Sequence, residues 1–177
     1  MESFATPVPD HAQAKTWEPY PLISPTKFLV LCLLSLGLYG LWWQYKTWRF
    51  FKQWQQTDNW PVLRAIFSLF TFNGLLQNIN QFAYSTGGYT PIPNTTGLAA
   101  GYIILNLRAR LPEPLWLVYL GASGFLLPAF RAFREAMLQS SDYGGYDQKR
   151  FSTRQVVALI LGLICWTLLF IGLTLPS

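Results

Sequence analysis

The last 23 residues of this 177-residue sequence, Gln155 to Ser177, contain no charged side chain. A helix needs about 20 predominantly apolar residues to cross ~30 Å of hydrocarbon, and this stretch supplies them. Charge is scarce elsewhere too, since charged residues make up 12% of the chain, against roughly 25% in soluble domains. These two shortages exclude an ordinary soluble domain and predict an integral membrane protein.

The chain is also poor in residues that carry chemistry. It has one histidine, His11, and two cysteines, Cys32 and Cys165, which both lie in apolar runs. A disulfide framework or a metal site needs more ligands at closer spacing, so we expect neither, and no cofactor. The apolar cores of the predicted spans hold no Asp, Glu, Lys, Arg or His, which disfavours proton pumps and ion-coupled transporters. Their serines have no His or Lys at helical spacing, and we expect no enzymatic activity.

The formal net charge of +5 is compatible with nucleic-acid binding. The basic residues, however, lie in the gaps between apolar runs, which is the distribution that the positive-inside rule produces. We therefore expect membrane lipids, anionic ones in particular, as partners in place of nucleic acid. A membrane protein partner or a second copy of the chain is left open as a further contact.

The pattern of apolar runs predicts an all-α fold. We expect an integral membrane helical bundle with about four spanning helices (range about 3–5) plus one re-entrant or interfacial helix. Residues 1–26 are predicted to be a flexible, polar, Pro-rich tail, and residues 27–177 a single helical membrane domain. The predicted spans are 28–46, 96–110, 115–134 and 156–175, while 65–83 is re-entrant, interfacial or spanning.

The distribution of basic residues predicts the orientation of this bundle. With four spans, nine basic residues lie on one side of the membrane and four on the other. If 65–83 also spans, the division becomes six against seven. The first arrangement fits the positive-inside rule better and places both termini outside the cytoplasm. Lys15 and Lys27 are then the exceptions, because they lie on the exported side.

The end of the first predicted span combines basic and aromatic side chains. Lys46, Arg49 and Lys52 interleave with aromatic residues that include Trp48 and Trp54. A segment of this kind can bind anionic lipid headgroups or a partner protein. The alternative is an ordinary basic flank that only sets the orientation of the helix.

A row of amides marks the segment 65–83. Asn73, Gln77, Asn80 and Gln81 fall at i, i+4, i+7 and i+8, which is one face of a helix. Amides in lipid need hydrogen-bond partners, and these usually lie on a neighbouring helix. The row is therefore a packing seam, the wet face of an interfacial helix, or the wall of a polar cavity.

The segment 21–52 reads PLISPTKFLVLCLLSLGLYGLWWQYKTWRFFK. It resembles the start of a group of small bacterial multi-pass membrane proteins of unknown function, which share Thr-x-Lys, Gly-x-Tyr and Trp-x-Tyr-Lys-x-Trp motifs. The matching positions are Thr26, Lys27, Gly37, Tyr39, Trp43, Tyr45, Lys46 and Trp48. RAIFSLF at 64–70 and RFSTRQVVALILGLICW at 150–166 resemble later segments of those proteins. The resemblance implies a bacterial cytoplasmic-membrane protein and implies no activity.

Two functions fit these features. The first is a non-enzymatic multi-pass membrane protein that acts through lipid or partner-protein contacts at the basic aromatic segment. The alternative is a small channel, carrier or receptor with a cavity lined by the four amides. Uncharged amides suit a neutral polar solute better than an ion.

Overall fold

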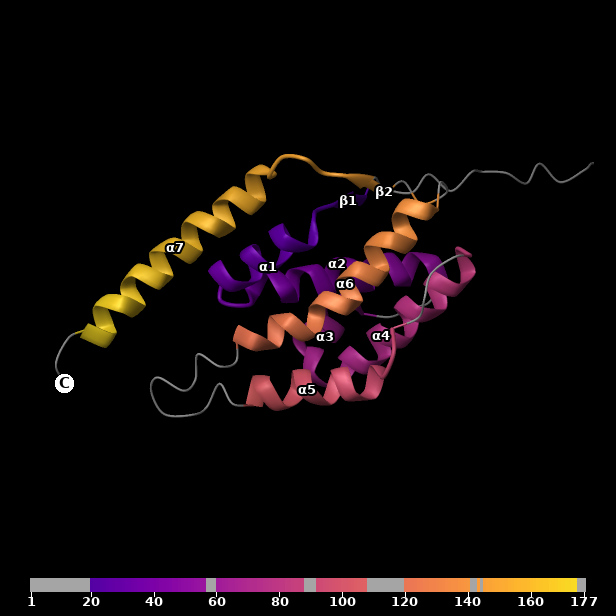
Figure 1. Cartoon of the computed structure of the whole chain (residues 1–177), viewed down its shortest axis with the longest axis horizontal. Helices are drawn as coiled ribbons and strands as arrows, with labels where there is room; N and C mark the ends of the chain where they lie inside the picture. The colour runs from indigo at the N-terminus through magenta and orange to yellow at the C-terminus, as the bar shows by residue number, and fades with distance from the viewer. Residues whose placement is uncertain are drawn as a thin grey trace, which may run out of the picture.

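The structure is a computed structural model that describes residues 20–56, 60–87, 92–107, 120–140, 143 and 145–174, without the side chains of Arg154 and Leu173. The described part is all-helical apart from two short strands, as predicted. In chain order the elements are β1 (Tyr20–Leu22), α1 (Pro25–Leu34), α2 (Leu38–Gln55), α3 (Pro61–Ile66), α4 (Ser68–Ser85), α5 (Thr95–Leu107), α6 (Ala122–Gln139), β2 (Gly145–Asp147) and α7 (Thr153–Thr174) (Figure 1).

The predicted tail ends earlier than residue 26. Residues 1–19 lie outside the described residues, but Tyr20–Leu22 form a strand and α1 begins at Pro25. Pro25 suits the first position of a helix because its ring fixes φ, and it has no amide to leave unpaired. Ser24 caps α1, since its side-chain oxygen accepts a hydrogen bond from the Lys27 amide (3.4 Å). Local turn chemistry therefore starts α1 ahead of the first apolar run.

The predicted span 28–46 is wrong as one continuous helix, because α1 ends at Leu34 and α2 starts at Leu38. Leu36 and Gly37 both have positive φ, at 51° and 82°. The Gly37 amide donates to the Cys32 carbonyl (2.7 Å), a bond typical of helix C-termini with left-handed residues. The chain therefore turns in the middle of the run, where its apolar composition gives no sign of a break.

The two helices on either side of this turn form an antiparallel hairpin. The ring of Phe28, near the start of α1, lies 5.4 Å from the ring of Trp43. Closer to the turn, a Cβ on Gly40 would lie 3.6 Å from the sulfur of Cys32. Residues progressively earlier in α1 thus meet residues progressively later in α2. This pairing brings Lys27 and Lys46 to the same, open end of the hairpin.

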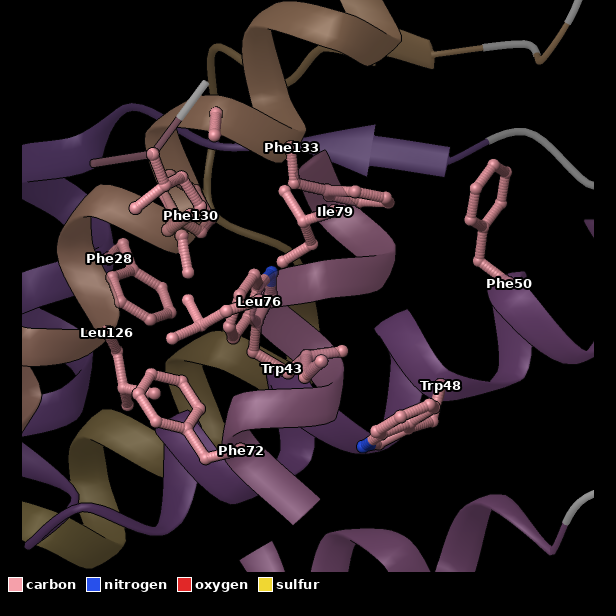
Figure 2. Packing of buried hydrophobic residues seen from close by; sticks show 14 of the residues in the cluster. Phe28, Trp43, Trp48, Phe50, Phe72, Leu76, Ile79, Leu126, Phe130 and Phe133 are labelled. Carbon is pink, nitrogen blue, oxygen red and sulfur yellow. The ribbon is translucent and has the colours of Figure 1, made fainter. Parts of the chain in front are cut away.

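Aromatic rings fill the core between α2, α4 and α6. Phe133 on α6 packs with Phe50 and Phe51 of α2 (ring centroids 5.4 and 5.9 Å apart) and with Phe82 of α4 (5.9 Å). Phe28 and Phe130 stack at 4.2 Å, and Figure 2 shows them side by side. Such pairs contribute roughly 0.5–1.5 kcal/mol each beyond their area burial. We call these three helices with their shared core the aromatic body.

Strands β1 and β2 join the start of the described chain to its last third. They pair in parallel, with Tyr20 opposite Gly145 and Leu22 opposite Asp147. The guanidinium of Arg134 on α6 holds this ribbon from the side. Its Nε donates to the Ile23 carbonyl (3.1 Å) and one terminal nitrogen contacts the Asp147 carboxylate (2.9 Å). The ribbon closes the open end of the hairpin.

Helix α7 agrees with the predicted span 156–175, except that it begins three residues earlier, at Thr153. It lies apart from the aromatic body and crosses α1 (Figure 1). Gly162 makes the crossing possible, because a Cβ there would overlap the backbone oxygen of Leu34. Near this crossing the Trp166 indole donates to the Leu33 carbonyl (3.3 Å). The rest of α7 is largely exposed.

The other predicted spans are helices with different bounds. Helix α5 (Thr95–Leu107) begins one residue before the predicted span 96–110, whose last three residues are not described. Helix α6 runs five residues beyond the end of the span 115–134, while 115–119 are not described. The segment 65–83 lies in α3 and α4, with a break at Phe67. Within the described ranges, α7 alone is long and apolar enough to cross a membrane, over Gln155–Gly172.

Candidate functional site

The described part of the chain is strongly basic. It contains ten of the 13 basic residues and two of the eight acidic ones. At the open end of the hairpin, the Lys27 ammonium donates to the Lys149 carbonyl (2.7 Å) and lies 5.3 Å from the centre of the Phe151 ring. Lys149 and the adjacent Arg150 are exposed. The Lys27 side chain therefore contacts the backbone of a basic segment, Lys149 and Arg150, just before α7 begins.

Lys46 lies at the same end on two aromatic faces. Its ammonium is 4.4 Å from the centre of the Tyr20 ring and 4.9 Å from that of Trp42. Burial raises the pKa of the Tyr20 phenol well above its usual range, with a smaller opposing effect from the Thr47 hydroxyl. The phenol therefore stays neutral, and its ring attracts the ammonium by a cation–π contact. Two aromatic rings therefore hold the Lys46 ammonium in place at the open end of the hairpin.

The other members of that segment do not form one surface with Lys46. Trp48 is buried, and the Arg64 guanidinium lies 4.4 Å from the centre of its ring. Trp54 is half-buried, and its indole donates to the Tyr143 hydroxyl (3.3 Å). Arg49 is exposed and Lys52 half-buried. Because the segment is helical, its members point in different directions. The two tryptophans face the protein, and Arg49 faces outward.

The four amides of α4 do share one side of the helix, but they face different surroundings. Gln77 and Gln81 are exposed. Asn80 holds the following loop, because its side chain accepts from the Ile92 amide (2.9 Å) and donates to the Ile92 carbonyl (3.4 Å). Asn73 has a buried side-chain oxygen without a partner among the described residues. One amide of the row therefore has an evident role, which is to fix a loop.

Sequence reasoning missed a buried polar cluster between α2, α4 and α5. The Gln44 side chain is fully buried and donates to the Tyr102 hydroxyl (3.2 Å), which also meets the Ser68 hydroxyl (3.4 Å). The signal was present, since Gln44 is an amide inside a predicted span and needs a partner there. Its partner is 58 residues away, and a single sequence does not reveal that pairing.

An apolar groove lies between the hairpin turn and α7. It has a volume of about 290 Å³ and is lined by Ser35, Leu38, Trp42, Leu161, Gly162 and Cys165, among others. We call it the α7 groove. A second, smaller cavity of about 40 Å³ adjoins it and shares Tyr39, Trp42 and Gln155 with it. Lys46, Gln148 and Ser152 also line this smaller cavity, which we call the polar cavity.

One hydrogen bond separates the groove from the polar cavity. The buried Gln155 amide at the start of α7 donates to the Tyr39 hydroxyl of α2 (3.0 Å). The Gln155 carbonyl oxygen accepts from the Ser152 amide (2.9 Å), so both ends of this amide are paired. The site is therefore apolar on one side of Tyr39 and Gln155, and polar and cationic on the other.

Metal binding has no candidate in the part of the chain that the structure covers. Among the described residues, His, Cys, Asp and Glu form no group of three or more able to hold an ion. The two cysteines are free: Cys32 is buried, and Cys165 is exposed beside the α7 groove. What the site offers is an apolar surface with a basic end.

Comparisons of the chain with protein-family models, with curated proteins and with solved structures give no match.

Proposed function

We propose that this chain is a non-enzymatic membrane protein that contacts anionic lipids at its basic end. That end comprises Lys27, Lys46, Lys149 and Arg150, with Arg49 and Lys52 farther along α2. The contact of Lys27 with Lys149 carries the proposal, because it brings the hairpin and the start of α7 into one basic surface. Juxtamembrane cations of this kind are attracted to anionic headgroups by about 1 kcal/mol each.

Exposure of α7 supports its assignment to a membrane. A core helix of a soluble protein can be equally long and apolar, but such a helix is mostly buried. In α7 only 11% of the 18-residue apolar window is buried, and its side chains include exposed Leu, Ile and Phe. Leaving this area in water would be costly, at roughly 25 cal/mol per Å². Hydrocarbon is the surrounding that removes this cost.

The remaining predicted spans are reassigned in this proposal. Of 28–46, 96–110, 115–134 and 156–175, the last is kept as the helix that crosses the bilayer. The hairpin α1–α2 enters the bilayer and returns to the same side, with its turn in the hydrocarbon. At about 1.5 Å per residue, the ten residues of α1 reach ~15 Å, half the hydrocarbon thickness.

The re-entrant hairpin removes one exception to the positive-inside rule. Lys27 then lies on the same side as Lys46, in place of the opposite side that one spanning helix would require. Basic flanks on the cytoplasmic side are the usual arrangement in the cytoplasmic membrane of bacteria. The proposed location is accordingly the cytoplasmic membrane, with the basic end facing the cytoplasm.

Side-specific labelling tests the hairpin. In a variant with Cys165→Ser, single cysteines are placed at Thr26 and at Gln53, in the first turn of α1 and near the end of α2. An impermeant thiol reagent is applied to sealed vesicles of known orientation. Labelling of both positions from the same side is expected. Labelling from opposite sides would return 28–46 to a spanning helix and overturn the proposal.

Lipid selectivity tests the proposed contact. Native mass spectrometry of the full chain in micelles, with phosphatidylglycerol and phosphatidylcholine in competition, should show a preference for the anionic lipid. Lys149→Gln with Arg150→Gln should weaken that preference more than the matched pair Arg49→Gln with Lys52→Gln. A larger effect of the second pair would move the site to the basic segment of α2. No preference in the wild-type chain would refute lipid selection altogether.

The alternative function, transport or sensing of a neutral polar solute, stays a prediction. None of Asn73, Gln77, Asn80 and Gln81 lines the α7 groove or the polar cavity. No observation in the described residues favours that function, and we do not propose it.

A further inference from the structure

The α7 groove has the size and the lining of a site for an alkyl chain. Its volume of about 290 Å³ is nearly twice that of the roughly 150 Å³ apolar cavity that accepts benzene. Its walls are Leu38, Trp42 and Leu161, together with the bare backbone at Gly162. The Tyr39 hydroxyl at its edge already pairs with Gln155, so the groove presents few polar groups to an occupant.

The groove also continues onto surface that we assign to the bilayer. Leu38 and Leu161 line it and remain 67% and 58% exposed. They belong to the hairpin turn and to the middle of α7, both of which lie in hydrocarbon in the arrangement proposed above. A lipid chain can therefore enter the groove laterally, directly from the hydrocarbon of the bilayer. A soluble ligand would have to cross the basic end first.

The polar cavity makes the two ends of the groove chemically different, because it adjoins one end only. Trp42 and Tyr39 line both the groove and the cavity, and on the far side of these rings stands the Lys46 ammonium. Ser152 lines the same cavity, and its hydroxyl oxygen accepts a hydrogen bond from the Gln155 backbone amide (3.4 Å), which leaves the hydroxyl proton to donate. A cation and a hydroxyl beside an apolar groove match an amphiphile that carries a negative charge at one end of its chain.

We propose that the α7 groove binds one acyl chain of an anionic membrane phospholipid, with the lipid phosphate beside Lys46 and Ser152. The inference rests on the proposed function and names the lipid site within it. The phosphate oxygens accept hydrogen bonds from the Lys46 ammonium and the Ser152 hydroxyl, while the chain lies between α7 and the hairpin turn. The lipid passes over the outer face of Trp42, which is 37% exposed and lines both cavities, so the bond between Gln155 and Tyr39 stays intact. The bound lipid then fills the gap between α7 and the rest of the molecule.

Filling the groove with a side chain tests where the lipid chain binds. Leu161→Trp places a larger ring inside the groove, and Leu163→Trp makes the same change on an exposed part of α7 outside the groove lining. Native mass spectrometry in micelles measures retained phosphatidylglycerol. We expect about tenfold weaker retention for Leu161→Trp, because the ring takes the space of the lipid chain and removes its apolar contacts with the groove. Leu163→Trp should leave retention unchanged. Ala158→Leu is the milder second variant if Leu161→Trp does not fold.

Replacing the cation tests the position of the headgroup. Lys46→Gln should reduce the preference for phosphatidylglycerol over phosphatidylcholine, and Lys46→Arg should retain it. Lys52→Gln removes the same charge two helical turns away, outside both cavities, and should have a smaller effect. Equal losses for Lys46→Gln and Lys52→Gln would indicate a diffuse basic surface and refute a defined phosphate position.

The thiol of Cys165 reports occupancy of the groove directly. It is exposed and lines the groove, whereas Cys32 is buried, so N-ethylmaleimide should modify Cys165 first. Added phosphatidylglycerol should slow this reaction in the wild-type chain and in Leu163→Trp. An unchanged rate would refute occupancy of the groove.

The possible failures can be told apart. If the wild-type chain prefers phosphatidylglycerol but Leu161→Trp keeps that preference and Cys165 stays reactive, the groove assignment alone is wrong. If the wild-type chain shows no preference, the proposed function fails with it. Equal protection of Cys165 by phosphatidylcholine would refute the role of the charge.

Discussion

Phe133 on α6 and Phe170 on α7 are the same residue type near the middle and the end of two long helices. Phe133 is fully buried among the rings of Tyr20, Phe50, Phe51 and Phe82. Phe170 is 60% exposed and meets only the Trp166 ring of its own helix, at 5.8 Å, among the described ring contacts. The aromatic body is thus held by its own packing, whereas α7 relies on what surrounds the protein.

Removing a ring should affect the two regions very differently. Phe133→Ala leaves a cavity in the aromatic body and should lower the free energy of unfolding by about 3–5 kcal/mol. Phe170→Ala should change it by about 0.5 kcal/mol or less, because no protein cavity forms. Unfolding in micelles, followed by far-ultraviolet circular dichroism, measures both. Equal losses would mean that α7 packs against protein surface, and the comparison would fail.

The crossing of α7 over α1 should be sensitive to a single methyl group. Gly162→Ala forces Cβ against the Leu34 carbonyl, so α7 must move, at a cost of about 1–3 kcal/mol. Gly172→Ala meets open space on the same helix and should be neutral or stabilising by up to about 1 kcal/mol. Spin labels at Val30 and Leu168 should report a longer distance in Gly162→Ala alone. An unchanged distance would show that the crossing tolerates the methyl group.

The hairpin turn should depend on the freedom of its glycine. Gly37 has a φ of 82°, which costs a residue with a side chain about 1–2 kcal/mol. Gly37→Ala should lower the free energy of unfolding by that amount. Gly124→Ala on α6 is the control, since its added methyl group meets open space and improves helix propensity. A stabilised Gly37→Ala chain would imply that α1 and α2 join into one helix.

The smallest effect is expected at the ion pair that holds the ribbon. Asp147→Asn removes the charge of the half-exposed carboxylate that pairs with Arg134 and should cost about 1 kcal/mol or less. Arg134→Gln also removes the hydrogen bond from its Nε to the Ile23 carbonyl, so its loss should exceed that of Asp147→Asn. Arg131→Gln, an exposed change one turn earlier, should cost almost nothing. Comparing the three unfolding midpoints separates the pair from the general effect of removing charge. Equal midpoints for all three would show that the pair stabilises nothing measurable.

The sequence predicted α7 within three residues because a long, uninterrupted apolar helix is defined by its own composition. Its apolar run is unbroken and its ends carry the usual polar signals, so no distant contact is needed to place it. The all-α class followed in the same way. The amides of α4 also fell on one side of the helix, since helical periodicity depends only on spacing.

The hairpin could not be predicted in this way. Leu36 and Gly37 turn the chain inside a run that reads as one span, and Lys27 and Lys46 look like flanks on opposite sides. They lie at the same end of the hairpin because α1 packs against α2, as in the contact of Phe28 with Trp43, and the apolar composition of the run does not reveal that pairing. The predicted basic aromatic site differs from the observed one because spacing along the sequence does not show which side chains packing turns inward. Spacing grouped Lys46 with Trp48 and Trp54, while packing turned those two rings toward the protein.

Strand β1 has a consequence for the order of assembly. Its partner β2 lies about 120 residues later in the chain, so the ribbon cannot close until β2 has left the ribosome. The α1–α2 hairpin can therefore fold before its open end is closed by the ribbon. In the arrangement proposed above, closing the ribbon would fix the point at which α7 enters the bilayer.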